Sequence, residues 1–129
     1  MGTRNVADGC LGPTINEIEP NGTFAQSQVV TFPASISGST FGAAGAPSAD
    51  NDAFSFTLAS ARTVTITLAG GTAEDMDLFL FNASQTNIGQ STGLDSNETI
   101  TMALAPGTYH VAVIPFDVTT ITSYTLNIQ

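Results

Sequence analysis

The stretch DAFSFTLASARTVTITL, residues 52–68, decides the fold, because apolar and polar residues alternate in it both before and after a short turn. Such alternation puts apolar side chains on one face of a strand and polar side chains on the other. The pattern returns at residues 99–104 and 124–128. Residues 78–81 and 111–116 are apolar on both faces, so we expect central or covered strands there. Short strands at this spacing predict an all-β fold, a jelly-roll-like antiparallel β-sandwich of about eight strands.

Length and composition indicate one domain. The chain has 129 residues and a mass of 13.2 kDa, the size of one ordinary domain. Helix is disfavoured, because Lys is absent, Glu is scarce, and Thr, Ser, Val and Phe are abundant. Residues 1–14 show no period and are expected to be a leader or linker, whereas residues 15–129 form the single domain. The low-complexity residues 38–49 are predicted to be a loop.

The charge balance excludes several classes of partner. Two arginines, Arg4 and Arg62, oppose eleven acids, so the formal net charge is −9. Binding of nucleic acid or of anionic lipid needs a cluster of cations, which this chain lacks. No apolar run approaches the ~20 residues of a membrane span, so no membrane insertion is expected. The single cysteine, Cys10, cannot form an internal disulfide.

One motif suggests an enzyme, and its context argues against that interpretation. Residues 89–93 match the G-x-S-x-G pattern around Ser91, and Asp95 and His110 follow in the order of an α/β-hydrolase triad. That mechanism needs the serine on a turn between a buried strand and a helix, but the following segment alternates as a strand. A single histidine also makes a zinc site of several nitrogen or sulfur ligands improbable. We therefore predict that the chain is not an enzyme.

The acidic residues are more informative, because they are grouped along the chain. The groups are Glu17/Glu19, Asp50/Asp52, Glu74/Asp75/Asp77 and Asp95/Glu98. Calcium takes about six to eight oxygen ligands from carboxylates, amide side chains and backbone carbonyls. Residues 17–21 offer three side-chain oxygens on a segment that Pro20 stiffens, and residues 50–52 offer three more before a predicted strand. From the residues alone, a calcium site and ordinary solvated loop acids both stay open.

Six short motifs also carry a family resemblance, and they occur in the family's order across residues 15–129. The sequence is similar to bacterial pre-peptidase C-terminal domains and to the related collagen-binding domains of clostridial collagenases. The motifs are EIEPNGT at 17–23, DAFSFTL at 52–58, GTAEDMDLFL at 71–80, SNETI at 96–100, APGTYHVAV at 105–113 and SYTL at 123–126.

This resemblance implies a jelly-roll-like module, not itself catalytic, that is attached to secreted or cell-surface proteins and often lies next to a protease. In the collagen-binding relatives the first motif and the acids before the second motif hold calcium. Carried over by position, and with Asp50 as a substitute, this implies a calcium site formed by Glu17, Glu19, Asn21, Asp50 and Asp52.

The chain also departs from these relatives at several positions. Gly22 stands where a carboxylate usually lies, and Ala49 stands at the position of an earlier Asp, which is why Asp50 is taken as the substitute. The relatives bind collagen through exposed tyrosines. The only tyrosines here, Tyr109 and Tyr124, lie on apolar strand faces and are expected in the core, so collagen binding is not carried over.

Two functions of different class follow. The first is an extracellular or cell-surface accessory and adhesion module, stabilised by calcium, with an extracellular protein or polysaccharide as its ligand. The alternative is a structural subunit that assembles with its own copies into an extracellular fibre or surface layer. The absence of Lys leaves edge strands unguarded, and the leader could add a strand to a neighbouring copy.

Overall fold

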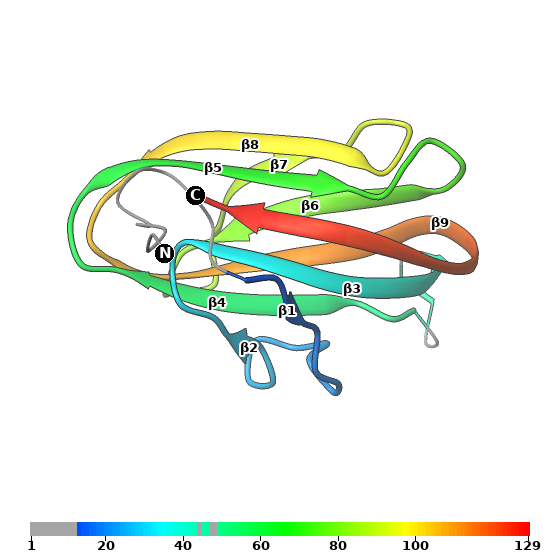
Figure 1. Cartoon of the computed structure of the whole chain (residues 1–129), viewed down its shortest axis with the longest axis horizontal. Coiled ribbons are helices and arrows are strands. Elements are labelled where there is room, and N and C mark those ends of the chain that lie inside the picture. Colours follow the sequence, from blue (N-terminus) through cyan, green and yellow to red (C-terminus); the bar gives the residue numbers. More distant parts are fainter. Residues whose placement is uncertain (1–12, 44, 47–48) are drawn as a thin grey trace.

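The computed structural model describes residues 13–43, 45–46 and 49–129, and in these residues it contains strands and no helix (Figure 1). This confirms the predicted all-β class. The strands are β1 (Ile15–Asn16), β2 (Gln28–Val29), β3 (Ala34–Ala43), β4 (Asp52–Leu58), β5 (Arg62–Ala69), β6 (Asp75–Phe81), β7 (Asn87–Ser91), β8 (Asn97–Leu104) and β9 (Gly107–Ile128).

The last strand, β9, organises the sandwich. Its first arm pairs with β4 and β6, and its second arm pairs with β3 and β5. Figure 1 shows the orange arm of β9 turning at one end of the molecule and returning as the red arm. One layer therefore has the order β1-β3-β9-β5-β8 and the other has the order β2-β4-β9-β6-β7. All pairings are antiparallel except those of the two-residue strands β1 and β2, which run parallel to β3 and β4.

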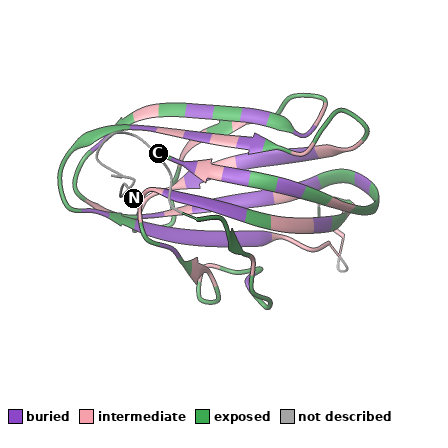
Figure 2. Ribbon diagram, in the orientation of Figure 1, coloured by how far each residue is buried: buried purple, intermediate pink, exposed green. Residues whose placement is uncertain are grey.

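The alternating sequence produces the core as predicted. In β5 the side chains of Val64, Ile66 and Leu68 are at most 1% exposed, whereas the threonines between them face outward. Figure 2 shows the same change between buried and exposed residues along β8 and the second arm of β9. Burial of each such aliphatic side chain contributes about 1.5–3 kcal/mol. The period of two therefore determines which face of each strand is turned toward the core.

The two runs that are apolar on both faces are indeed inner strands. β6 lies between β7 and the first arm of β9, and that arm lies between β4 and β6. The outward-facing Phe81 of β6 contacts Phe24, from the segment between β1 and β2. The Phe24 ring lies 4.9 Å from Phe81 and 5.2 Å from His110, edge-on in both cases.

The structure corrects the prediction of a loop at residues 38–49, because β3 continues to Ala43. Gly38 pairs with Tyr124 of β9, and a Cβ atom at Gly38 would lie 2.5 Å from the tyrosine hydroxyl oxygen. Small residues are therefore needed in this strand to accommodate a large neighbour, and they do not mark a loop. Residues 1–12 of the predicted leader, with Cys10, lie outside the described residues. Among the described residues, no helix has the length and apolarity to cross a membrane.

Candidate metal centre

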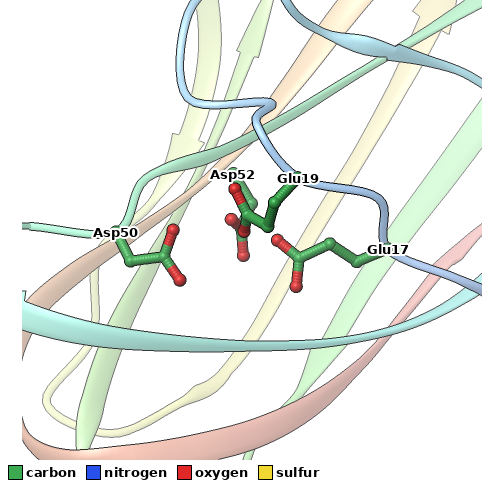
Figure 3. Close-up of side chains that lie close together, drawn as sticks. All are labelled: Glu17, Glu19, Asp50 and Asp52. Carbon is green, nitrogen blue, oxygen red and sulfur yellow. The ribbon is translucent and has the colours of Figure 1, made fainter.

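Four carboxylates that are far apart in the sequence converge beside β4. Glu17 and Glu19 follow β1, Asp50 precedes β4, and Asp52 is the first residue of β4. Each offers an oxygen that lies within 4.8 Å of those of the others. Figure 3 shows the four side chains pointing toward a common space. The structure thus brings together the four acids of the predicted calcium set, which we call the first acidic cluster.

Backbone hydrogen bonds position the first acidic cluster. The N–H of Glu17 donates to the Ser37 carbonyl (2.8 Å), which extends the short pairing of β1 with β3. The N–H of Ala53 donates to the Asn21 carbonyl (2.8 Å), which fastens the other end of this segment to β4. Between these points, the Ser39 N–H donates to Oε1 of Glu17 (3.0 Å). The acids of the N-terminal segment are therefore held over the start of β4.

Several oxygens at this place are buried and accept no hydrogen bond from the protein. They are Oδ1 of Asn21, Oδ1 of Asn51 and Oδ1 of Asp52. Asn21 and Asp52 have 0% exposure, and the amide nitrogen of Asn21 donates to Glu17 (3.3 Å). Leaving a buried acceptor without a partner costs about 1–3 kcal/mol. A set of carboxylate and amide oxygens with unused acceptors fits calcium, which takes oxygen ligands, and does not fit zinc, which prefers nitrogen and sulfur.

The protonation of the cluster also reflects crowding of negative charge. Burial, and next the contact with Glu17, raises the pKa of Asp52 to about 11. Burial, and next the charge of Glu19, raises the pKa of Asp50 to about 6. Although burial opposes it, hydrogen bonds led by that with Asp52 lower the pKa of Glu17. The raised pKa values favour a proton within the calcium-free cluster, and a divalent ion would compete with that proton.

Tyr124 is a part of this site that the sequence did not reveal. Its hydroxyl donates to Oδ2 of Asp52 (2.6 Å), and its ring is 2% exposed. Tyr109 is also buried, so the predicted core position of both tyrosines is confirmed. The second role of Tyr124 depends on the space left by Gly38. No local sequence pattern indicates the pairing of Gly38 with Tyr124.

The structure accounts for the two positions, Gly22 and Ala49, at which the sequence departs from the family motif. Gly22 is exposed, and a Cβ atom there would lie 3.1 Å from the carbonyl oxygen of Asn51, so a carboxylate at this position would need a shift of the backbone. Ala49 offers no ligand, and Asp50 does reach the cluster from one residue along. Asn51, whose Oδ1 is buried and unpartnered, was counted among the oxygens offered by residues 50–52 but was not placed in the predicted ligand set.

The residues of the hydrolase-like motif do not assemble. Ser91 pairs with Leu78 of β6, and His110 pairs with Phe81, three residues along, so the two side chains point to opposite faces. The Ser91 hydroxyl donates to Glu98, Asp95 accepts from the N–H of Asn97 (2.9 Å), and Nδ1 of His110 lies 3.4 Å from the Ser27 hydroxyl. A nucleophile, base and acid in contact are required for triad chemistry, and this place has no such arrangement.

The fold and the acidic cluster define a β-sandwich module whose most distinctive site is built of oxygen ligands. Residues 50–115 match the family model of the bacterial pre-peptidase C-terminal domain, and the chain belongs to this family. The predicted resemblance is thereby confirmed. Domains of this family are accessory modules rather than catalytic units. Of the predicted ligands, Asp50 and Asp52 lie within the matched range, whereas Glu17, Glu19 and Asn21 precede it.

Solved structures agree with this assignment at the level of the fold. The pre-peptidase C-terminal domain of collagenase from Bacillus anthracis aligns with a TM-score of 0.67 and 21% identity, over 88% of this chain and 100% of that one. A periplasmic inhibitor of g-type lysozyme, PliG from Aeromonas hydrophila, aligns with a TM-score of 0.47 and 20% identity, over 91% of this chain and 100% of that one. The first similarity supports the assignment of the fold, whereas the TM-score of the second is too low to support it further. A comparison with curated proteins finds no match.

Proposed function

We propose that the chain is an accessory module of a secreted or cell-surface protein, serving adhesion or targeting toward an extracellular protein or polysaccharide. In this proposal a calcium ion at the first acidic cluster fastens residues 17–28 to the sandwich. The observation that carries it is Asp52, which has 0% exposure, an unpartnered Oδ1 and three further carboxylates around it. Glu17, Glu19, Asn21 and Asp50 would complete the ligand set.

Calcium at this place has a structural consequence for the N-terminal segment. Residues 17–28 contact the sandwich mainly through a few hydrogen bonds and through Phe24, which covers the outer side of Phe81 and His110. A ligand that binds only the folded state stabilises it by about 2.7 kcal/mol at 100 times its dissociation constant. The ion would therefore hold the segment down and keep the aromatic surface beneath it covered. Its removal would expose that surface and raise repulsion among the carboxylates.

The test is thermal unfolding with calcium and with a chelator, on the wild type and on Asp52→Asn. We expect calcium to raise the melting temperature of the wild type by roughly 10 °C at saturating concentration, from about 2.7 kcal/mol at a few degrees per kcal/mol. Asp52→Asn should remove the part of the increment that the first acidic cluster supplies, whereas its stability in chelator should be retained, because a neutral side chain suits a buried site. Asp117→Asn is the matched control, since Asp117 is an exposed acid outside the first acidic cluster. Equal melting temperatures of the wild type in calcium and in chelator would refute the proposal.

A further inference from the structure

A second group of carboxylates converges at the end of the sandwich where β7 connects to β8. Asp75 and Asp77 lie on β6, and Glu98 lies on β8. Oxygens of the three carboxylates lie within 4.8 Å of one another. The strands β6 and β8 belong to different layers, and residues 92–96 join β7 to β8 next to the group. We call these three residues the second acidic cluster.

The most informative residue of the second acidic cluster is Asp77. It is only 7% exposed, yet its buried Oδ1 accepts no hydrogen bond from the protein. Oδ1 of Asp75 is likewise buried and unpartnered. Both belong to side chains of one strand, and each side chain has an oxygen within 4.8 Å of an oxygen of Glu98. Buried side-chain oxygens in native proteins nearly always have partners, so each of these calls for one.

Glu98 differs from the two aspartates, because the protein holds both of its oxygens. The Ser91 hydroxyl donates to Oε1, and the N–H of Gly93 donates to Oε2 (2.8 Å). A Cβ atom at Gly93 would lie 3.2 Å from Oε2, so glycine at this position lets the backbone approach closely. Glu98 is 4% exposed and is thereby fixed in direction. A fixed carboxylate facing two with unused oxygens is a preorganised set of oxygen ligands.

The surroundings provide room and negative charge. A hollow of about 200 Å³ lies at the cluster and is lined by Asp75, Asp77, Thr92, Gly93, Leu94 and Phe116. Burial, and next the charge of Asp75, raises the pKa of Asp77 to about 6, and burial also raises the pKa of Asp75. Arg62, the arginine among the described residues, lies at the opposite end of β5 from the residue that pairs with Glu98. The charge of the second acidic cluster therefore has no cationic side chain to balance it among the described residues.

We propose that Asp75, Asp77 and Glu98 form a second calcium site, which ties β6 to β8 and holds residues 92–96 in place. The set contains only oxygen ligands, and the hollow leaves space for water molecules to complete a coordination of about six to eight. This site is separate from the one at Asp52 and does not depend on it.

Stoichiometry tests the proposal directly, with calcium titrated calorimetrically into the full chain. We expect two ions per chain for the wild type, one for Asp77→Asn and one for Asp52→Asn. A wild type that binds one ion, lost in Asp52→Asn and kept in Asp77→Asn, would overturn the second site and leave the first intact. Loss in Asp77→Asn alone would instead overturn the first site.

A second measurement keeps the test decisive if Asp77→Asn fails to fold. Calcium is titrated into Asp52→Asn while the backbone amide resonances are followed by nuclear magnetic resonance. We expect calcium to shift the amides of residues 75–77 and 92–98, including that of Gly93, and to leave those of residues 17–22 in place. Magnesium, which demands a tighter octahedral shell, should produce a weaker response. Unchanged amides at residues 75–77 and 92–98 at saturating calcium would overturn the proposal.

Discussion

The two acidic clusters share one design and differ in what they join. In each, one aspartate is almost fully buried and keeps an oxygen that accepts no hydrogen bond: Asp52 in the first acidic cluster and Asp77 in the second. The first acidic cluster connects the segment between β1 and β2 to the start of β4. The second connects two strands that are already part of the sandwich. We infer that a cation in the first cluster controls whether the N-terminal segment is attached, whereas a cation in the second stiffens a loop.

The largest predicted effect comes from removing both sites together. At 100 times the dissociation constants, two independent sites would stabilise the chain by about 5 kcal/mol, twice the increment of one site. The double variant Asp52→Asn/Asp77→Asn should lose all of it, and the two single variants should each lose about half. The sum should be additive within about 0.5 kcal/mol, because the sites share no ligand. Urea unfolding in calcium and in chelator measures these increments, and strong non-additivity would show that the clusters act as one unit.

Substituting alanine for the glycine beside each cluster, Gly38 or Gly93, should destabilise the chain to different extents. Gly38→Ala would bring a Cβ atom to 2.5 Å from the buried Tyr124 hydroxyl, a clash that the packed ring cannot easily relieve. We expect a loss of about 1–3 kcal/mol, also in chelator, by overpacking. Gly93→Ala meets Glu98 at 3.2 Å and should cost less, with its effect confined to the second cluster. Chemical unfolding of both variants checks this order, and equal losses would contradict it.

The two buried tyrosines provide a smaller and more specific comparison. Tyr124→Phe removes the hydroxyl that donates to Oδ2 of the buried Asp52. Tyr109→Phe removes a hydrogen bond to the carbonyl of Ala105 (2.7 Å), at the edge of the sandwich. Loss of the first bond should cost about 1–3 kcal/mol in chelator, and loss of the second about 1 kcal/mol. Calcium affinity should change only in Tyr124→Phe. An equal change in Tyr109→Phe would show that Tyr124 has no specific role at the calcium site.

A different kind of prediction concerns the effect of pH on the calcium-free protein. Burial raises the pKa values of Asp50 and Asp77 to about 6, above the ordinary value of 3.8. A carboxyl whose pKa is raised by folding binds its proton more tightly in the folded state, so the unfolding free energy should fall as pH rises from about 4. The contributions of Asp50 and Asp77 end near pH 6, and that of Asp52, whose pKa is raised to about 11, continues through neutral pH. The lowered pKa of Glu17 works in the opposite direction and reduces the slope.

The pH effect should be reversed in calcium, because the ion needs the deprotonated ligands and its stabilisation grows with pH. Melting temperatures between pH 4 and 7, with calcium and with chelator, provide the measurement. Parallel pH profiles in the two conditions would count against ion binding by these groups.

The sequence predicted the strands well, because the period of two and the burial that it causes are local properties. Residues 63–68 and 99–104 lie in β5 and β8 as expected. The loop predicted at residues 38–49 was partly wrong, because the space that Tyr124 requires is set by a strand pairing with a distant part of the chain.

The first acidic cluster was predictable because a family motif gathers its ligands, although calcium binding itself stays a prediction. The second cluster was not assembled from the sequence, since Glu98 on β8 meets Asp75 and Asp77 on β6 although the two strands do not pair with each other. Neither adhesion nor self-assembly through edge strands leaves a comparable local pattern, so these also stay predictions.

Hydrogen exchange of residues 17–28, followed by mass spectrometry in calcium and in chelator, tests the central claim most directly. Few backbone hydrogen bonds hold this segment, including that from Glu17 to Ser37. We predict that calcium slows exchange in this segment of the wild type and has no such effect in Asp52→Asn. Identical exchange of residues 17–28 with calcium and with chelator in the wild type would contradict the account.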